Sequence, residues 1–252
     1  MNGNKTRVIR PSQLHTSMLD DILQKYSELL STVDRWFARA SAAAGEAVVC
    51  SRGCSACCRG LFDITLLDAC FLKQGFDRLP PLLRERVMTK ALKRLETLRV
   101  VRPDLEQPYI LNIRPEEEWE ALMPDDDETP CPLLGDDGLC LVYQYRPMTC
   151  RLHGIPLIDV SGEIFHDEWC TLNFTEEDPL SRKGLRWEFR ETFQQELLLF
   201  QEFTSTLLNE KFNELDTLIP TALLIDFKGF AWGRWWAQNA ERIRRAGSAG
   251  SR

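Results

Sequence analysis

The sequence predicts an α+β fold that is mainly α-helical, in which a cysteine-rich core with small β-hairpins is wrapped by long N- and C-terminal helices. Apolar residues recur every three or four positions over residues 12–44 and 185–218, as they do in amphipathic helices. Between these segments, the apolar runs CPLL and LCLVY flank residues 135–138, and IPLIDV and EIFHDEW flank residues 161–162, as in hairpins. The expected organisation is one domain, 1–252, with a metal-binding core at 50–172 and flanking helices at 12–44 and 185–245.

Residues 12–44 are expected to form one long helix. Ser12 or Thr16 would cap its start, and Gly45 would end it. Its apolar stripe lies along a single face and comprises Met18, Leu19, Ile22, Tyr26, Leu29, Leu30, Val33, Trp36, Phe37 and Ala40.

The middle of the chain is expected to alternate short strands, helices and turns. After the first four cysteines, GLFDI would form a short strand, and Thr65 would then cap a helix because Asp68 follows in a capping-box arrangement. Two further helices are predicted at 80–99, which begins with two prolines, and at 115–122. The segment 146–154, between the two hairpins, is predicted as a turn or a single helical turn.

The C-terminal part is expected to be helical. The stripe that begins at Leu185 continues to Pro220, and an aromatic segment with an arginine-rich end follows it. Aromatic residues in such a segment are more often core than cofactor site, although Trp and Arg are also enriched in binding hot spots. We therefore name 227–245 as the candidate surface for a protein partner or a membrane, and we expect the tail 246–252 to be disordered.

The dense cysteines indicate metal binding rather than disulfides. Four of the nine lie within residues 50–58, as C-x3-C-x2-C-C, and four more are spread along residues 131–170. The N-terminus carries no export signal, and no apolar run is long enough to predict a transmembrane helix. We expect a cytoplasmic protein, in which thiols stay reduced and clustered cysteines more often hold metal. Cys70 sits apart in an apolar helical run, so we expect it to be a buried core residue.

These motifs resemble the YkgJ-like cysteine-cluster family. The family pattern is a CxxCC-like element, then C-P-x-L, a Gly-x-Cys step, Y-x-x-R-P, C-R and a later cysteine. The matching residues are Cys54, Cys57, Cys58, Cys131, Pro132, Leu134, Gly138, Cys140, Tyr143, Arg146, Pro147, Cys150, Arg151 and Cys170. The resemblance implies a zinc- or iron-chelating domain far more strongly than any reaction. Distant relatives, the flagellin lysine N-methylases, share only the cysteine element.

The expected metal ligands are the eight clustered thiols: Cys50, Cys54, Cys57, Cys58, Cys131, Cys140, Cys150 and Cys170. Thiolates suit zinc, copper(I) and iron–sulfur clusters, so the expected cofactor is zinc or an iron–sulfur cluster. Eight thiols can make two four-thiolate sites, or one cluster plus spare thiols. The adjacent pair Cys57 and Cys58 fits two metals of a multinuclear site, or one ligand beside a non-ligand. The last pair of the first group, Cys57 and Cys58, has no obvious local partner, so we expect the first group to meet the second in space.

Charge compensation is a second expectation for the site. A zinc ion held by four thiolates carries a net charge of about −2, which nearby cations or N–H donors must offset. Arg59, Arg146 and Arg151 flank the cysteines and are expected to do so, and for Arg151 the family pattern adds weight. His153 and His166 are weaker candidates as additional ligands.

Two classes of function remain after these observations. The net charge of −7 argues against broad nucleic-acid binding, and no HExxH, P-loop, GxSxG or dinucleotide motif is present. The first hypothesis is a metal-binding protein that holds zinc or an iron–sulfur cluster. The second is an iron–sulfur enzyme in redox or group-transfer chemistry, such as modification of a protein side chain. A brown or a colourless protein after anaerobic purification would separate the two.

Overall fold

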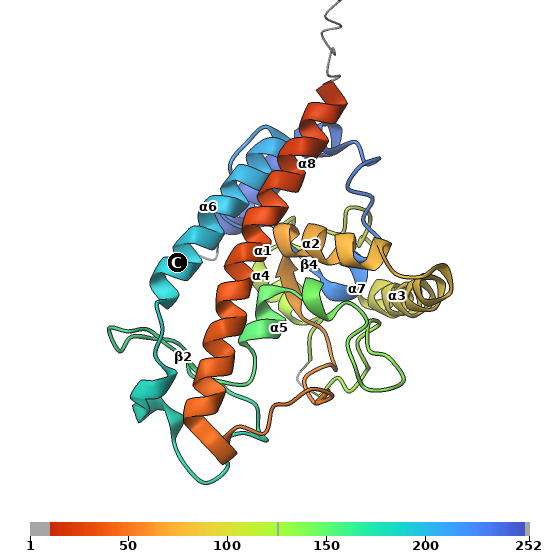
Figure 1. Cartoon of the computed structure of the whole chain (residues 1–252). Coiled ribbons are helices and arrows are strands. Elements are labelled where there is room, and N and C mark those ends of the chain that lie inside the picture. Colours follow the sequence, from red (N-terminus) through yellow and green to blue (C-terminus); the bar gives the residue numbers. More distant parts are fainter. Residues whose placement is uncertain (1–10, 125, 250–252) are drawn as a thin grey trace, which may run out of the picture.

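A computed structural model describes residues 11–124 and 126–249, and its longest element is helix α1 (Pro11–Ala44). This helix runs the length of the molecule beside α6 (Phe189–Leu208), and α8 (Trp232–Ala249) packs on α6 (Figure 1). The predicted apolar face of α1 is confirmed, although Met18 is exposed. The residues of that face that are at most 1% exposed are Ile22, Tyr26, Leu30, Val33, Trp36 and Ala40.

A two-stranded sheet joins the middle of the chain to its C-terminal part. Strand β1 (Asp63–Thr65) pairs antiparallel with β4 (Asp216–Leu218), and Ile64 lies opposite Thr217. The prediction of a helix up to Pro220 is therefore wrong at its end. Helix α6 stops at Leu208 because Asn209 adopts a left-handed conformation (φ 59°), which ends helices. Residues Asp216–Leu218 beyond it form a fully buried strand instead.

The helices that follow β1 match their sequence signals. Thr65 caps α2 (Leu66–Asp77), because its hydroxyl accepts a hydrogen bond from Asp68 N (3.1 Å). Helix α3 (Pro81–Val101) begins with proline at its first position, and α4 (Glu116–Glu120) is short. The predicted single helical turn is α5 (Met148–Leu152). Short 3-10 turns lie at Gly45–Ala47, Tyr143–Tyr145, Pro179–Ser181 and Lys183–Leu185.

Only one of the two predicted hairpins forms as a sheet. Strands β2 (Leu157–Ile158) and β3 (Ile164–His166) pair antiparallel, which confirms the second hairpin. The first is an irregular turn with an isolated bridge between Leu134 and Cys140. Four turn residues and short flanks give this segment too few cross-strand bonds to make a regular ladder.

One side of the C-terminal segment packs into the core, and most of its other residues are exposed. After the one-turn helix α7 (Ile219–Ala222), α8 buries Trp232, Trp236 and Ile243 at 5–7% exposure. The ring of Trp236 lies edge-on against Phe212, with 4.6 Å between centroids. Helix α8 continues to Ala249, and the last three residues of the tail that was expected to be disordered lie outside the described part of the chain.

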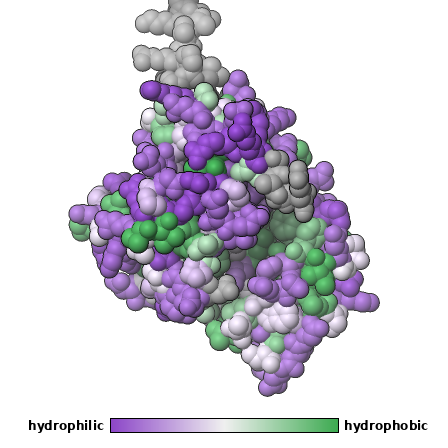
Figure 2. Space-filling model, turned by 180° about the vertical axis from the view of Figure 1, so that it is seen from behind, coloured by the Kyte–Doolittle hydropathy of each residue, from purple (hydrophilic) through white to green (hydrophobic). Residues whose placement is uncertain are grey.

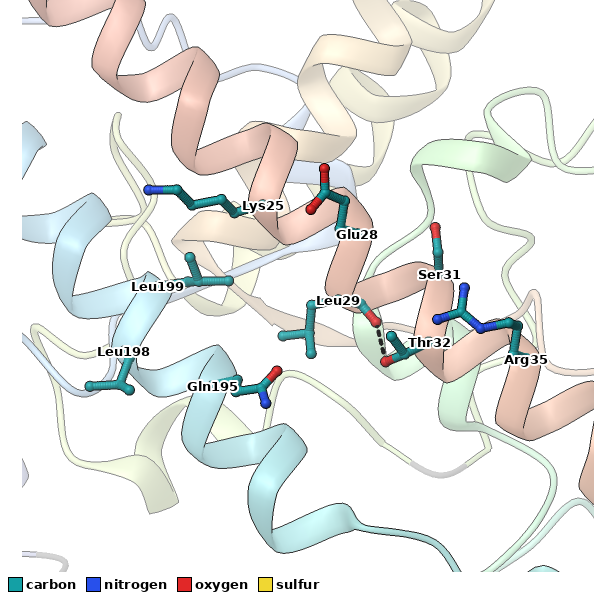
Figure 3. A pocket seen from close by; sticks show the side chains of 9 residues that line it. All are labelled: Lys25, Glu28, Leu29, Ser31, Thr32, Arg35, Gln195, Leu198 and Leu199. Atoms are coloured by element: carbon teal, nitrogen blue, oxygen red, sulfur yellow. Dashed lines mark hydrogen bonds between the residues drawn. The ribbon is translucent and has the colours of Figure 1, made fainter.

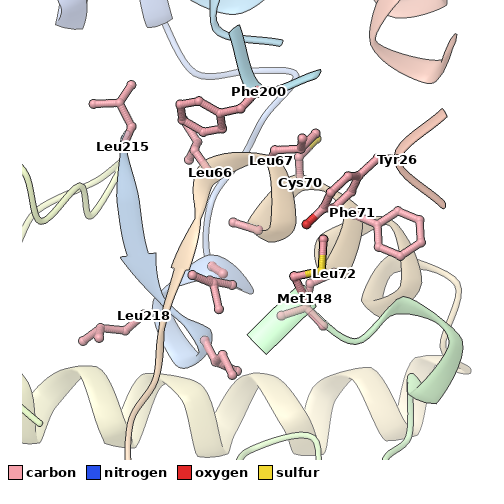
Figure 4. Close-up of a cluster of buried hydrophobic side chains, with 14 of the residues drawn as sticks. Tyr26, Leu66, Leu67, Cys70, Phe71, Leu72, Met148, Phe200, Leu215 and Leu218 are labelled. Atoms are coloured by element: carbon pink, nitrogen blue, oxygen red, sulfur yellow. The ribbon is translucent and has the colours of Figure 1, made fainter. Parts of the chain in front are cut away.

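The core forms where α1, α2 and α6 meet the β1–β4 sheet. Figure 4 shows Leu66, Leu67 and Phe71 of α2 gathered with Tyr26 of α1 and Phe200 of α6. Cys70 belongs to this cluster and is 8% exposed. Burial raises the pKa of its thiol to about 12, so Cys70 behaves as a small apolar residue.

The surface carries no extended apolar band on the face seen in Figure 2. That face is mostly hydrophilic, and its apolar side chains form separate patches. Among the described helices, none combines the length and the apolar character that crossing a membrane requires.

Candidate metal centre

Backbone pairing brings the first four cysteines to the second four. Cys131 N donates to Cys58 O (2.9 Å), and Gly60 N donates to Thr129 O (2.9 Å). Arg59 and Pro130 form an antiparallel bridge between these two bonds. The expectation that the two groups meet in space is therefore confirmed for Cys58 and Cys131.

The irregular turn after Cys131 returns the chain to the same place. Leu141 N donates to Leu133 O (2.9 Å), and Gly135 N donates to Leu139 O (2.8 Å). These bonds close the loop so that Cys140 lies near Cys131, and the Cys140 thiol contributes to the raised pKa of Cys131.

Helix α5 delivers Cys150, and a buried carboxylate fixes this helix. Asp68, 2% exposed, accepts hydrogen bonds from Met148 N (2.9 Å) and from the hydroxyl of Tyr26 (2.8 Å). Because Met148 is the first residue of α5, the carboxylate caps the helix that carries Cys150. Tyr26 stands on α1, so the long N-terminal helix takes part in positioning the cysteine.

Five thiols share one neighbourhood, which we call the inner thiol group. Its members are Cys57, Cys58, Cys131, Cys140 and Cys150. Burial raises the pKa of Cys150 well above its usual value, and the nearby thiols of Cys131 and Cys140 raise it further. Burial likewise raises the pKa of Cys131 to about 11. Cys131 and Cys150 are therefore protonated at neutral pH until a metal displaces their protons.

The adjacent thiols of Cys57 and Cys58 differ from each other in pKa. A hydrogen bond between the two side chains raises the pKa of Cys57 and lowers that of Cys58, so the pair loses its first proton at Cys58. Such a pair supplies one thiolate more readily than two.

The remaining three cysteines, Cys50, Cys54 and Cys170, form an outer thiol group. The pKa of Cys50 is raised by burial, and the thiols of Cys170, Cys54 and Cys57 add to the rise. The Asn173 amide donates to Cys50 Sγ (3.3 Å), which lowers that pKa in part. Cys57 is therefore close to both groups.

The three arginines expected at the site have different surroundings. Arg146 is near the thiols, since its charge lowers the pKa of Cys57 and offsets part of the rise at Cys140. Its guanidinium lies 4.1 Å from the ring centroid of Tyr143 and donates to Asp34 (2.8 Å).

The guanidinium of Arg151, which is 3% exposed, donates hydrogen bonds to two backbone carbonyl oxygens, Arg146 O (3.0 Å) and Gln144 O (2.8 Å). It also forms an ion pair with Asp34 of α1. Arg151 therefore ties the turn before α5 to α1. The contacts of Arg59 run to exposed Glu128 (3.5 Å). Thiolate compensation by Arg59 and Arg151 remains a prediction.

The chemical type of the side chains at this site fits a metal, although their positions do not form a complete coordination shell. Within residues 11–124 and 126–249, no three Cys, His, Asp or Glu side chains surround one point as the ligands of a bound ion do. The inner thiol group nevertheless supplies five soft sulfur donors, more than the four that a tetrahedral zinc or iron centre requires. Arg146 supplies a positive charge beside them.

Sequence reasoning missed three polar residues that shape the centre: Asp34, Asp68 and Asn173. Asp34 interrupts the apolar face of α1 and Asp68 follows a capping threonine, so each had a local explanation that hid its long-range contact. Asn173 follows Cys170 by three residues, which was the only available signal. His153 packs edge-on against Phe62, with 6.0 Å between centroids, and burial lowers its pKa.

Comparison with known proteins assigns the cysteine-rich segment. Neither curated proteins nor solved structures give a match to the chain. Residues 49–171 match the family model described as "CxxCxxCC: Putative zinc- or iron-chelating domain", and this range contains all nine cysteines. The cysteine-rich part of this chain, residues 49–171, is therefore similar to the CxxCxxCC family of zinc- or iron-chelating domains.

Proposed function

We propose that the protein binds a zinc or iron centre through thiolates of the inner thiol group. The observation that carries this proposal is the pairing of residues 58–60 with residues 129–131, which joins cysteines from distant parts of the sequence. A bound metal would link these segments covalently through sulfur, so its binding free energy adds to the stability of the fold.

The chain's own residues prepare the site for a cation. Hydrogen bonding within the pair directs the first deprotonation to Cys58, and the other thiols release protons to solvent as ligands form. Arg146, held by Asp34, then balances part of the thiolate charge. Metal affinity should consequently increase with pH across the neutral range.

Two cavities lie away from the thiols. One of about 630 Å³ lies between α1 and α6, lined by Lys25, Leu29 and Leu199 among others (Figure 3). Another of about 510 Å³ lies beside Trp187. Neither of these two cavities is lined by a cysteine, so the proposed metal centre is separate from both. Such thiols remain available in a reducing compartment, so we place this function in the cytoplasm.

Metal content of cysteine variants tests the proposal. The protein is purified anaerobically, and zinc and iron per chain are measured together with visible absorbance. Cys58→Ser and Cys150→Ser should each lower bound metal, whereas the matched control Cys70→Ser, in the apolar core, should leave it unchanged. Wild-type metal content in both site variants would refute the ligand assignment. A brown protein with a broad blue absorbance would instead favour the iron–sulfur enzyme.

A further inference from the structure

The cavity of about 510 Å³ lies where the end of α1 meets the segment that leads into α6. The end of α1 and the turn Lys183–Leu185 lie side by side in the lower part of Figure 1. The residue that follows β2 completes the lining. The volume is within the range of roughly 300–1,000 Å³ that is typical of pockets for small molecules.

The core holds the walls of this cavity in place. The indole N–H of Trp36, on α1, donates to Leu185 O (2.9 Å) and so fixes the turn to the long helix. Trp187 N donates to Ile158 O (3.0 Å), and Val160 N donates to Trp187 O (3.0 Å), so the following residues are bound to the β2 segment. The walls are therefore positioned before any ligand binds, which lowers the entropic cost of binding.

Three cationic side chains line the cavity without a counter-charge in contact with them. Within residues 11–124 and 126–249, the side chains of Arg39, Lys183 and Arg186 form no hydrogen bond and no ion pair. The chain has 38 acidic residues against 31 basic ones, so carboxylates are not scarce. The nearby Arg190, for comparison, forms an ion pair with Glu163. The cations of the cavity are thus free to contact an anion.

Arg186 shows most directly that an acceptor is lacking. Its Nε is buried and has no hydrogen-bond partner among the described residues. A buried donor without an acceptor is unfavourable, and more so when it is charged. The guanidinium lies against the turn between β2 and β3, where a Cβ on Gly162 would be 3.4 Å from Arg186 Nη2. An anion in the cavity would give this guanidinium the acceptor that the protein does not provide.

The charge and the apolar part of the lining indicate the class of ligand. Three cations and one carboxylate, that of Glu188, give the lining a formal charge of +2. A phosphate monoester carries about −1.5 to −2 at pH 7, and arginine can bind its oxygens through two N–H groups at once. Beside the cations lie the half-buried indole of Trp187 and the side chain of Val160, which is 55% exposed. An apolar group next to the phosphate would cover them.

We propose that this cavity binds a small molecule that carries a phosphate monoester next to an apolar or aromatic group. Arg39, Lys183 and Arg186 contact the phosphate, and Trp187 and Val160 contact the apolar group. No cysteine lines the cavity, so this binding is independent of the metal centre and of the function proposed for it. Free metabolites and the headgroup of phosphatidic acid share this chemistry.

Calorimetric titration of the full-length chain with phenyl phosphate tests the proposal. Wild type should bind one equivalent, about tenfold more tightly than inorganic phosphate, because the ring covers apolar surface. Arg186→Gln should weaken the binding of phenyl phosphate by at least about tenfold, since a charged donor is lost. Glu188→Gln, which removes the carboxylate of the lining, should strengthen it.

A matched control separates this site from a general effect of charge. Arg190→Gln removes the same charge from a nearby residue outside the lining, so the affinity should stay within about twofold of wild type. Metal content and the midpoint of urea unfolding should remain those of wild type in all three variants. Equal weakening in Arg186→Gln and Arg190→Gln would overturn the proposal.

Vesicles identify the source of the phosphate. Cosedimentation is measured with vesicles of phosphatidylcholine alone and of phosphatidylcholine with phosphatidic acid in equal parts. Binding that requires phosphatidic acid and is lost in Arg186→Gln would assign a lipid headgroup, whereas binding of phenyl phosphate alone would assign a free metabolite, and either result supports the proposal. Absence of binding to both probes would overturn it. Equal affinity for phenyl phosphate and inorganic phosphate would overturn the role of Trp187 and Val160.

Discussion

Replacing Arg151 by lysine separates two roles for this buried cation. The guanidinium, 3% exposed, donates to the carbonyl oxygens of Arg146 and Gln144 and pairs with Asp34. Lysine retains the positive charge, but its single ammonium cannot reproduce the planar fork of the guanidinium. The substitution therefore keeps charge near the thiols and removes structural hydrogen bonds.

The expected loss follows from the bonds that lysine cannot make. A hydrogen bond involving a charged group contributes about 1.5–3 kcal/mol, and two carbonyls lose their charged donor. We expect Arg151→Lys to lower the free energy of unfolding by about 3–6 kcal/mol, a large part of the ~5–15 kcal/mol of a typical domain. Urea unfolding followed by circular dichroism measures it. The decrease should be the same in metal-free and metal-loaded protein, because the acceptors are not thiols.

A matched substitution checks this reasoning. Arg59 pairs with Glu128 at the surface, so Arg59→Lys should change the free energy of unfolding by less than about 1 kcal/mol. If Arg151→Lys costs under ~1 kcal/mol in metal-free protein but several times more in the loaded protein, the structural account is wrong. Compensation of thiolate charge, as the sequence indicated, would then be the role of Arg151.

Three further predictions concern the rest of the fold. Burial, with the charge of Asp68, raises the pKa of Glu196 to about 8 from its ordinary 4.5, so folding favours the protonated form of this side chain. The free energy of unfolding should therefore fall as pH rises from about 5 to 8. Urea unfolding of Glu196→Gln should lack this part of the decline. Truncation after Pro220 removes buried Trp232 and other core residues, so we expect insoluble protein without metal; a soluble product with its metal would contradict this. Gly75→Ala places a Cβ 2.4 Å from the Tyr145 ring, and the melting temperature should fall, by an amount matching about 1–3 kcal/mol; an unchanged value would show that the ring can move aside.

Local signals in the sequence predicted local structure well. Thr65 and the two prolines at residues 80–81 identify helix starts because caps act within one turn of the chain. The apolar face of α1 was predictable because its period persists over nine turns of helix, as the length of Pro11–Ala44 allows.

Long-range pairing was beyond such signals. Leu215 and Leu218 happen to continue the helical period of α6. Leu218 is nevertheless a strand residue, and Leu215 directly precedes the strand, because this segment pairs with the distant strand β1. For the candidate site, the spacing predicted which cysteines cluster and that the two groups meet. Their division into inner and outer groups depends on Asn173 and Gly154, whose contacts no sequence period encodes.

The pairing of β1 with β4 also constrains the order of events during synthesis. β1 follows the CxxCC element within a few residues, but its partner strand β4 is made only after all eight clustered cysteines. A growing chain therefore presents its thiols on the ribosome long before the sheet that anchors them can close, and long-range strand pairing is slow once the partner arrives. The thiols are therefore open to oxidation during that interval, before the sheet beside them has closed.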